Sequence, residues 1–381
     1  MKKGWSKVAF GDLFDLDLDS VTVDASASYQ MVGVLSYGRG LFGKSPVGGA
    51  DTSYKTFYRL HSGQLVVSQL FGWEGAIAPV TSEFDGAYVS SQFPTFRSKA
   101  NLDAGFARWL VRNPSVWEHL KGAAKGMGDR RRTLSPEIFF GVSTLLPPLP
   151  EQQRIVAHLD AIESRLTHAN KLRKEQEKEL KAVLNAAFHK LEANADWVEM
   201  GDVAPLHRRP TEIAIEGEYE ELGARSFGKG IFHKPTLRGE SLTWQKLFQV
   251  HTGDIVISNI KAWEGAIAVA GEADHGRYGS HRYLTCVVDP KRALPEFICF
   301  YLLSTSGLEQ VGLASPGSAD RNRTLAVDRL HKIKVPVVPL AAQLDFKKLL
   351  DLQSRVRTEA MRSAQRSNAL LPSLLDRIFN S

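Results

Sequence analysis

The sequence predicts a mixed α/β fold of the α+β kind, with two globular domains joined by two long antiparallel coiled-coil helices. Three observations predict it. The same motifs occur twice at one displacement, and each half ends in a long segment with coiled-coil apolar spacing. The remainder of each half contains short strand-like runs separated by Gly and Pro. We expect a pseudo-two-fold axis to relate the two halves.

The internal repeat is the strongest of these observations. GVLSYGRGLFGK in the first half, for example, corresponds to GARSFGKGIFHK in the second, displaced by 190 residues. The matched blocks are residues 33–44 with 223–234, 61–78 with 251–268, 129–134 with 320–325, and 148–152 with 339–343. Chance does not maintain nearly one displacement through so many blocks. The chain therefore contains two halves of about 190 residues each.

Each half has the same predicted order, a globular part followed by a long helix. Short strands are predicted at Gln64–Ser68 and Asp254–Ser258, and helices at Ala104–Trp109 and Leu294–Leu303. The predicted divisions are a first globular domain at 1–147, a first helix at 148–192, a second globular domain at 193–338 and a second helix at 339–381.

The long helices are predicted from their apolar residues, which alternate in steps of four and three. Pro150 and Glu151 suit the first turn of the first helix, the second helix starts near Ala341, and Pro372 can kink it near its end. The predicted coiled-coil and subunit-docking residues are Ile155, Leu159, Ile162, Leu166, Phe346, Leu350 and Val356. A lone helix of this length cannot bury its apolar stripe, so we expect the two helices to pair. Alternatively, each helix packs only on its own globular part.

Composition narrows the class of protein. The formal net charge of +6 and the pI near 9.1 favour a polyanionic partner. The two cysteines, Cys286 and Cys299, lie in no CxxC or Cys/His cluster, so neither a disulfide framework nor a zinc site is expected, which suits a reducing cytoplasm. No signal peptide or membrane span is expected, because the apolar runs are too short.

The junction before the first helix resembles a known family. LPPLPEQQRIVAHLD at 146–160 is similar to the motif at which the first recognition domain passes into the helix in specificity subunits of type I restriction-modification enzymes. The resemblance in layout covers the whole chain. The second half departs from the motif, because Ala341 and Ala342 stand where Pro150 and Glu151 stand in the first.

This resemblance implies a non-catalytic DNA-binding subunit. Each globular domain would act as a target-recognition domain for one half of a bipartite duplex DNA target, and the helices would set the spacing. The helices would also dock two adenine methyltransferase subunits that use S-adenosylmethionine, with restriction subunits that use ATP and Mg²⁺ joining the full complex. No cofactor or metal is expected in this chain. Since the two domains differ in sequence, the target should be asymmetric.

Candidate DNA-binding residues are cations that could neutralise phosphates and polar groups that could contact base edges. Glycines beside several of these residues would let the backbone approach DNA closely. The alternative is that these segments are ordinary turns with solvated lysines and arginines. The candidates are Arg39, Lys44, Lys55, Gln92, Arg130, Arg131, Arg132, Lys229, Lys234, Lys261, His281, Arg282, Arg321 and Arg323. Trp73 and Trp263 could stack on a base, but a core position is favoured for both.

Enzyme functions find little support in the sequence. Residues 38–45 satisfy GxxxxGK[ST], but Pro46, Gly48 and Gly49 argue against the helix that a phosphate-binding loop must open into. No NPPY-type tetrapeptide, clear S-adenosylmethionine loop or cluster of metal ligands is found. The alternative from another class is a coiled-coil assembly scaffold whose globular domains bind protein.

Overall fold

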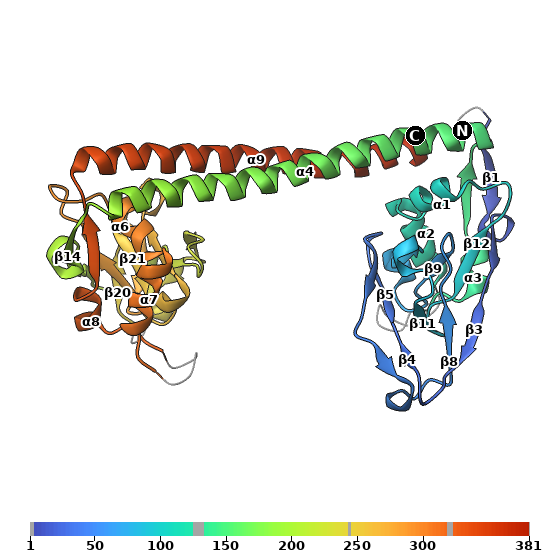
Figure 1. Cartoon of the computed structure of the whole chain (residues 1–381), viewed down its shortest axis with the longest axis horizontal. Helices are drawn as coiled ribbons and strands as arrows, with labels where there is room; N and C mark the ends of the chain where they lie inside the picture. Colours follow the sequence, from blue (N-terminus) through green and yellow to red (C-terminus); the bar gives the residue numbers. More distant parts are fainter. Residues whose placement is uncertain (1–3, 125–132, 243–244, 318–322, 381) are drawn as a thin grey trace. The chain divides into compact units, whose positions relative to one another are not determined.

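The structure, a computed structural model, describes residues 4–124, 133–242, 245–317 and 323–380. The chain forms two compact units. Unit 1 comprises Met1–Arg173 and Ala360–Ser381, and unit 2 comprises Lys174–Glu359. Each unit thus combines a globular part with one end of each of the two long helices, α4 (Leu149–Glu192) and α9 (Leu340–Asn380), drawn in Figure 1. The four-part division by element type stays a prediction.

The two globular parts are built from short antiparallel strands in nearly the same order. The strands of unit 1 are β1 (Ser6–Ala9), β2 (Phe14–Leu16), β3 (Asp19–Thr22), β4 (Ser28–Tyr29), β5 (Val32–Leu35), β6 (Gly40–Gly43), β7 (Val47–Gly48), β8 (Thr56–Arg59), β9 (Leu65–Val67), β10 (Ile77–Pro79), β11 (Tyr88–Ser90), β12 (Thr95–Ser98) and β13 (Ser143–Leu146). Those of unit 2 are β14 (Asp196–Glu199), β15 (Pro210–Thr211), β16 (Glu218–Tyr219), β17 (Leu222–Ala224), β18 (Ile231–His233), β19 (Leu237–Arg238), β20 (Leu247–Gln249), β21 (Ile255–Ser258), β22 (Ile267–Val269), β23 (Tyr278–Ser280), β24 (Tyr283–Cys286) and β25 (Lys334–Val337).

Two small sheets form the frame of each unit. In unit 1 the strand orders are β10-β9-β12-β2 and β11-β8-β3, and in unit 2 they are β22-β21-β24 and β15-β20-β23. The central strands β9 and β21 are completely buried, as expected for apolar runs covered on both faces. They lie within the two segments in which the repeat predicted strands, so both predictions are confirmed.

Short helices pack beside the sheets in each unit. They are α1 (Ala104–Leu110), α2 (Pro114–Ala123) and α3 (Pro136–Gly141) in unit 1, and α5 (Met200–Val203), α6 (Pro295–Leu302), α7 (Thr305–Leu313) and α8 (Val327–His331) in unit 2. The two helices predicted in these regions, now α1 and α6, are confirmed. Within the described part of the chain, no helix is both long and apolar enough to cross a membrane.

The core of unit 1 contains residues from both long helices. Ile155 and Leu159 at the start of α4 are buried together with Leu375 and Phe379 near the end of α9. Farther along, the Arg173 guanidinium donates to the hydroxyls of two serines of α9, at 2.8 and 3.0 Å. The start of one helix therefore packs beside the end of the other, and α9 continues through Pro372.

The core of unit 2 shows the converse arrangement. Leu184 and Phe188 near the end of α4 are buried with Phe346 near the start of α9, and the rings of Phe188 and Phe346 lie 5.4 Å apart. The two helices are therefore antiparallel, which confirms the predicted pair. The alternative, in which each helix packs only on its own globular part, is wrong.

Both cysteines belong to the core of unit 2. Cys286 and Cys299 are buried and form no disulfide. Burial raises the pKa of each thiol to about 12, because the thiolate would lose its hydration. The two side chains therefore act as small apolar groups in packing.

A buried glutamine fixes the start of each long helix. The Gln152 side chain accepts a hydrogen bond from the Asp103 amide (2.8 Å) and donates to the carbonyls of Asn101 and Pro147 (3.0 and 2.9 Å). The matching Gln343 side chain accepts a hydrogen bond from the Leu294 amide (2.8 Å) and donates to the carbonyls of Arg292 and Val338 (3.1 and 2.7 Å). The final glutamines of the repeated blocks PLPEQ and PLAAQ thus make the same kinds of bonds, although Pro-Glu precedes the first and Ala-Ala precedes the second.

Replacing Gln152 with Ala should therefore destabilise unit 1. The change leaves a buried amide and two carbonyls without partners, so the free energy of unfolding should fall by about 1–3 kcal/mol. Denaturant unfolding measures it, with Gln153→Ala, an exposed neighbour on the same helix, as the matched control. Equal stability of the two variants would contradict the structural role of the buried side chain.

Candidate nucleic-acid interface

The turn that carries the repeated WEG motif is the centre of the candidate site. We call residues 68–75 of unit 1 and 258–265 of unit 2 the central turns. Each follows the end of a buried strand and contains a 3-10 helix, η3 (Gly72–Glu74) or η7 (Ala262–Glu264). The buried strands β9 and β21 join the central turns to the core, and other segments attach to these turns.

A glycine-rich loop attaches to each central turn first; these loops are residues 36–40 and 226–230. In unit 2, the Phe227 amide donates to the Glu264 carbonyl (2.7 Å), and the Ser226 hydroxyl donates to the Glu264 carboxylate (2.8 Å). The Gly228 amide also donates to the Gly265 carbonyl (2.9 Å). The equivalent bonds in unit 1 run from Tyr37 N to Glu74 O (2.9 Å), from Gly38 N to Gly75 O (2.9 Å) and from Ser36 Oγ to the Glu74 carboxylate (3.3 Å). The two loops are thus fastened in the same way.

Two further segments meet at the second residue of each central turn. In unit 2, the Asn259 amide donates to the Arg282 carbonyl (2.8 Å), and the Asn259 carbonyl accepts from the Leu325 amide (2.7 Å). The equivalent bonds in unit 1 are Gln69 N to Gln92 O (2.9 Å) and Leu134 N to Gln69 O (2.8 Å). Segments separated by up to about 100 residues in the sequence therefore converge on one turn in each unit.

In unit 2 this convergence gathers most of the cations predicted for DNA binding. Lys229 lies in the glycine-rich loop, Lys261 in the central turn, and His281 and Arg282 are exposed in the attached segment. Arg323 precedes Leu325, and its guanidinium donates to two carbonyls at 2.9 and 3.3 Å.

Two of the predicted lysines already have carboxylate partners. Lys234 pairs with Glu221 at 2.8 Å, and its ammonium lies 5.1 Å from the centre of the Tyr283 ring. Lys261 pairs with Glu264 at 2.5 Å, and this bond, together with the Ser226 hydroxyl, holds the pKa of the Glu264 carboxyl below its usual range. These pairs reduce the positive charge that the two lysines present.

The predicted residues of unit 1 are arranged similarly but carry fewer charges. Arg39 is exposed in the glycine-rich loop, where its side chain turns back to the Ser36 carbonyl (2.9 Å). The ammonium of exposed Lys44 lies about 6 Å from the centres of the Phe42 and Phe93 rings. Gln92, which precedes Phe93 in the sequence, is half-buried.

Some predicted residues are not brought to the central turns. Lys55 is exposed in the loop before β8, where its carbonyl accepts a hydrogen bond from the Val23 amide (3.0 Å). Arg130, Arg131, Arg132 and Arg321 lie outside the described residues.

The two repeated tryptophans differ in exposure. Trp73 is 8% exposed, and its indole donates to the Leu70 carbonyl (2.9 Å). It is therefore a core residue, as the sequence analysis predicted. Trp263 is half-buried, with the Lys261 ammonium 5.4 Å and the Arg323 guanidinium 4.8 Å from its ring centre. These cation–π contacts hold cations beside the turn.

The chain is similar to known proteins in structure. No protein-family model matches the chain, and no curated protein matches it. Solved structures do. The HsdS subunit from Thermoanaerobacter tengcongensis is 18% identical, with a TM-score of 0.56, over 100% of this chain and 98% of that one. The type I restriction-modification S subunit from M. genitalium is 15% identical, with a TM-score of 0.51, over 99% and 96%.

A third match is to a chain from a structure of complex assembly and conformational transition of the type I R-M system. It is 20% identical, with a TM-score of 0.68, over 99% of this chain and 98% of that one. All three comparisons therefore extend over nearly the full length of both chains. The protein has the S-subunit fold.

Within this S-subunit fold, Arg208 is a candidate that the sequence did not single out. Its guanidinium donates to the His281 carbonyl (2.7 Å) and lies 4.3 Å from the centre of the Phe248 ring. Burial lowers the pKa of Arg208, because desolvation disfavours the cation. Arg208 therefore adds a cation beside the segment that carries His281 and Arg282. This proximity follows from the fold, because the residues lie more than 70 positions apart in the sequence.

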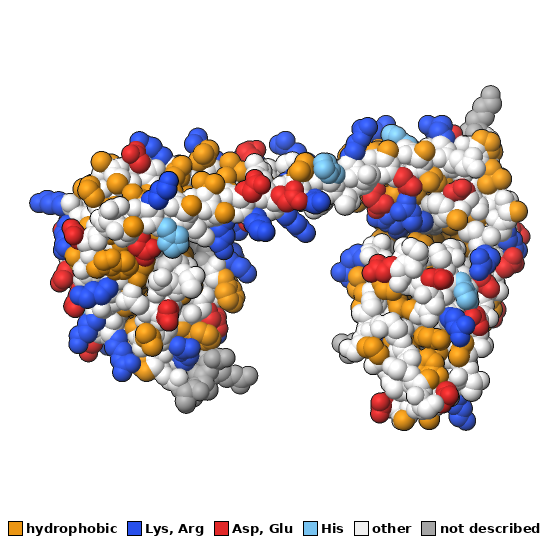
Figure 2. Space-filling view, in the orientation of Figure 1, with side chains coloured by type: hydrophobic (Ala, Val, Ile, Leu, Met, Phe, Trp, Pro, Cys, Tyr) orange, Lys and Arg blue, Asp and Glu red, His pale blue; other side chains and the backbone are white. Residues whose placement is uncertain are grey.

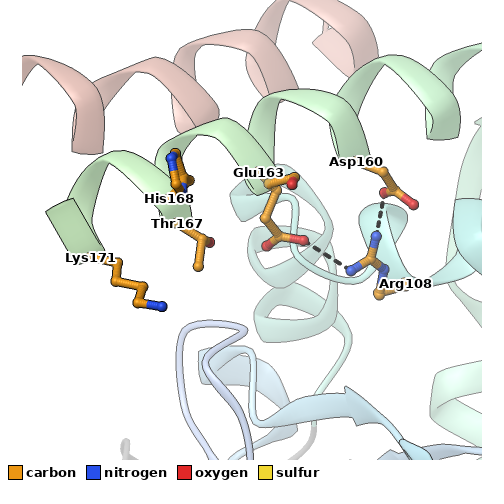
Figure 3. Close-up of a pocket in the computed structure, with 7 residues that line it drawn as sticks. Arg108, Asp160, Glu163, Thr167, His168 and Lys171 are labelled. Atoms are coloured by element: carbon orange, nitrogen blue, oxygen red, sulfur yellow. Dashed lines mark hydrogen bonds and ion pairs between the residues drawn. The ribbon is translucent and has the colours of Figure 1, made fainter.

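A groove with a volume of about 520 Å³ lies between α1 and α4 of unit 1 (Figure 3). Arg108 pairs there with both Asp160 and Glu163, the latter at 3.0 Å, and Arg112 pairs with Glu163 at 2.7 Å. The carboxylates neutralise the arginines, so the groove presents little positive charge to a polyanion. These pairs instead fasten α1 to α4.

Positive charge on the surface of the S-subunit fold is divided into small groups. In the face shown in Figure 2, lysine and arginine side chains alternate with acidic and apolar ones on each unit. Among the described residues, no group of His, Cys, Asp or Glu is placed to hold a metal ion. The central turns with their attached segments are therefore the best-defined candidate site.

Replacing Glu264 with Ala should loosen the glycine-rich loop of unit 2. The variant loses the carboxylate that accepts from Ser226 and Lys261, so amide hydrogen exchange at Phe227 and Gly228 should become several-fold faster. Hydrogen exchange with mass spectrometry measures the change, with Glu272→Ala, an exposed acid elsewhere in unit 2, as control. Unchanged exchange in the loop would show that its backbone bonds alone hold it.

Proposed function

We propose that this chain is the DNA sequence-specificity subunit of a type I restriction-modification complex, with no catalytic centre of its own. The observation that carries the proposal is the fold match over at least 96% of each solved chain, including two that are S subunits. The repeat and the helix junction motif support it independently. Recognition is then the task of this chain, and chemistry is that of its partner subunits.

DNA binding is assigned to the central turns and their attached segments. Cations there can neutralise phosphates, and exposed His281 and Arg282 can contact base edges in the major groove. Each unit would recognise one half of a bipartite target. Two linked binding modules gain affinity only when their sites have the correct separation, which is why the helices that continue from one unit into the other would set the spacing.

The two half-sites should differ, because the two units differ in the residues beside their central turns. At positions related by the repeat, the residues are Arg208, His281 and Arg282 in unit 2, and Leu18, Ser91 and Gln92 in unit 1. Two of these three residues are arginines in unit 2, whereas all three are uncharged in unit 1. The proposed target is therefore asymmetric.

Partner docking is assigned to apolar side chains that remain exposed on the long helices. Of the predicted docking residues, Ile155, Leu159 and Phe346 are buried in the cores, where they hold the fold together. The exposed large apolar residues of the two long helices are Leu149, Leu172, Met361 and Leu370 in unit 1, and Val183, Leu344, Leu349 and Leu352 in unit 2. We assign to them the docking of two adenine methyltransferase subunits that use S-adenosylmethionine; restriction subunits that use ATP and Mg²⁺ complete the complex.

Genome-wide mapping of methylated adenine tests this function directly. Strains with and without the gene should differ by one asymmetric, two-part sequence motif, because this chain alone would choose the site. Restoring the gene should restore the motif. Identical methylation in both strains would contradict the proposal and favour the alternative, an assembly scaffold that binds protein.

Salt dependence tests the assigned cations. The logarithm of the binding constant should fall linearly with the logarithm of the salt concentration, and Lys229→Ala should reduce the magnitude of this negative slope by about one. Lys234→Ala should reduce the magnitude of the slope by less, because the Lys234 ammonium already pairs with Glu221. Fluorescence anisotropy with a labelled duplex measures both slopes, with Lys348→Ala on α9 as control. A slope unchanged by Lys229→Ala would remove that residue from the phosphate contacts.

A further inference from the structure

Two aromatic residues have a backbone conformation that is unusual for their type. Among the described residues, Tyr37 and Phe227 are the only non-glycine residues with positive φ, and both have φ of 63°. They occupy equivalent positions of the repeat, 190 residues apart. Bulky residues with positive φ are rare because the side chain crowds the backbone. Two at one repeated position therefore indicate a shared requirement.

The glycine-rich loops hold both residues in this conformation. The amides of Tyr37 and Phe227 donate to the carbonyls of Glu74 and Glu264, and the glycine after each residue makes a further backbone bond to the turn. Those glycines also have positive φ, as in mirror-image hairpin turns, in which Asn and Gly are the usual central residues. Asn or Gly would thus suit the backbone better than Tyr or Phe.

Both rings are also exposed. Tyr37 is 62% exposed and Phe227 is 73% exposed. The Tyr37 ring has an edge contact with Trp117 at 6.2 Å between ring centres, and the Lys229 ammonium lies 5.5 Å from the Phe227 ring centre. Single exposed apolar residues are ordinary. Here, however, exposure and backbone strain coincide in both copies, and neither favours the folded state.

A basic residue accompanies each ring in the same loop, Arg39 in unit 1 and Lys229 in unit 2. Each central turn also lies against the segments with the other candidate DNA contacts. An aromatic ring beside a cation suits a nucleic acid, because the ring can stack on a base while the cation contacts a phosphate.

We propose that Tyr37 and Phe227 are DNA-wedge residues, each of which stacks on a base at a flexible step of its half-site. The proposal rests on the DNA-binding function proposed above. Apolar wedges of this kind partly unstack a base step and bend the duplex, so they discriminate sequences by deformability as well as by contact. The hydrogen bonds between each loop and its central turn reduce the backbone entropy that is lost when the ring is ordered on binding.

The test uses the full chain with its methyltransferase partner and a duplex that carries the mapped motif. Tyr37→Ala and Phe227→Ala should each weaken binding by about 5- to 150-fold, the range for losing one base–aromatic stack. The salt slope should not change, because no charge is removed. Tyr37→Phe and Phe227→Tyr keep a ring and should bind like the wild type. Ile215→Ala, which truncates a 76% exposed residue outside these loops, is the matched control.

Glycine variants separate a binding role from a structural one. Tyr37→Gly and Phe227→Gly relieve the positive-φ strain and remove the ring, so Tm should be equal to or above that of the wild type while affinity falls. A lower Tm with unchanged affinity would overturn the proposal, since the rings would then serve the fold.

The outcomes distinguish the two proposals. If the wild-type complex shows no salt-dependent preference for the motif duplex over a scrambled one, the DNA-binding function fails. If the wild type binds and both alanine variants bind equally well, only the wedge proposal fails. Weaker binding of the alanine variants with unchanged salt slope supports both.

Discussion

The interaction on which the rest of the structure depends is the exchange of helix ends between the two repeats. Leu375 and Phe379 come from the second repeat but complete the core of unit 1, while Leu184 and Phe188 come from the first and complete that of unit 2. Burying one such side chain contributes about 1.5–3 kcal/mol, whereas a whole domain is stable by only about 5–15 kcal/mol. Each unit therefore depends on a helix from the other repeat, which requires the chain to fold back antiparallel.

The central turns separate the frame of the site from its specificity. The backbone bonds that join the central turn, the glycine-rich loop and the two other segments are the same in both units. The side chains beside them differ, as Arg282 replaces Gln92 and Arg208 replaces Leu18. Because backbone bonds do not depend on side-chain identity, such a frame tolerates changes of specificity without loss of the fold. This arrangement suits the proposed recognition of two unlike half-sites by two copies of one domain.

The repeat made much of the fold predictable, because it reduced the chain to one unit used twice and left two unpaired amphipathic helices that had to pair. The start of the helices was also predictable from Pro150 and from the matching Gln152 and Gln343. The candidate site was harder to predict from the sequence. That Asn259 joins Arg282 to Leu325 depends on contacts between segments far apart in sequence, and the partnership of Lys234 with Glu221 follows from the register of β17 and β18. The positive φ of Tyr37 was not predicted, because a tyrosine does not by itself favour that conformation. The only pattern in the sequence that accompanies it is Ser-aromatic-Gly-basic-Gly, which occurs in both halves.

The helix exchange has a consequence for biosynthesis. The first globular part leaves the ribosome long before Leu375 and Phe379 are translated, so its apolar surface around Trp5 and Phe106 lacks a cover until then. The nascent chain must carry that exposed surface while about 200 further residues are made, a period in which chaperones have the opportunity to bind it. An S-subunit fold of this kind therefore closes its earliest-made unit last.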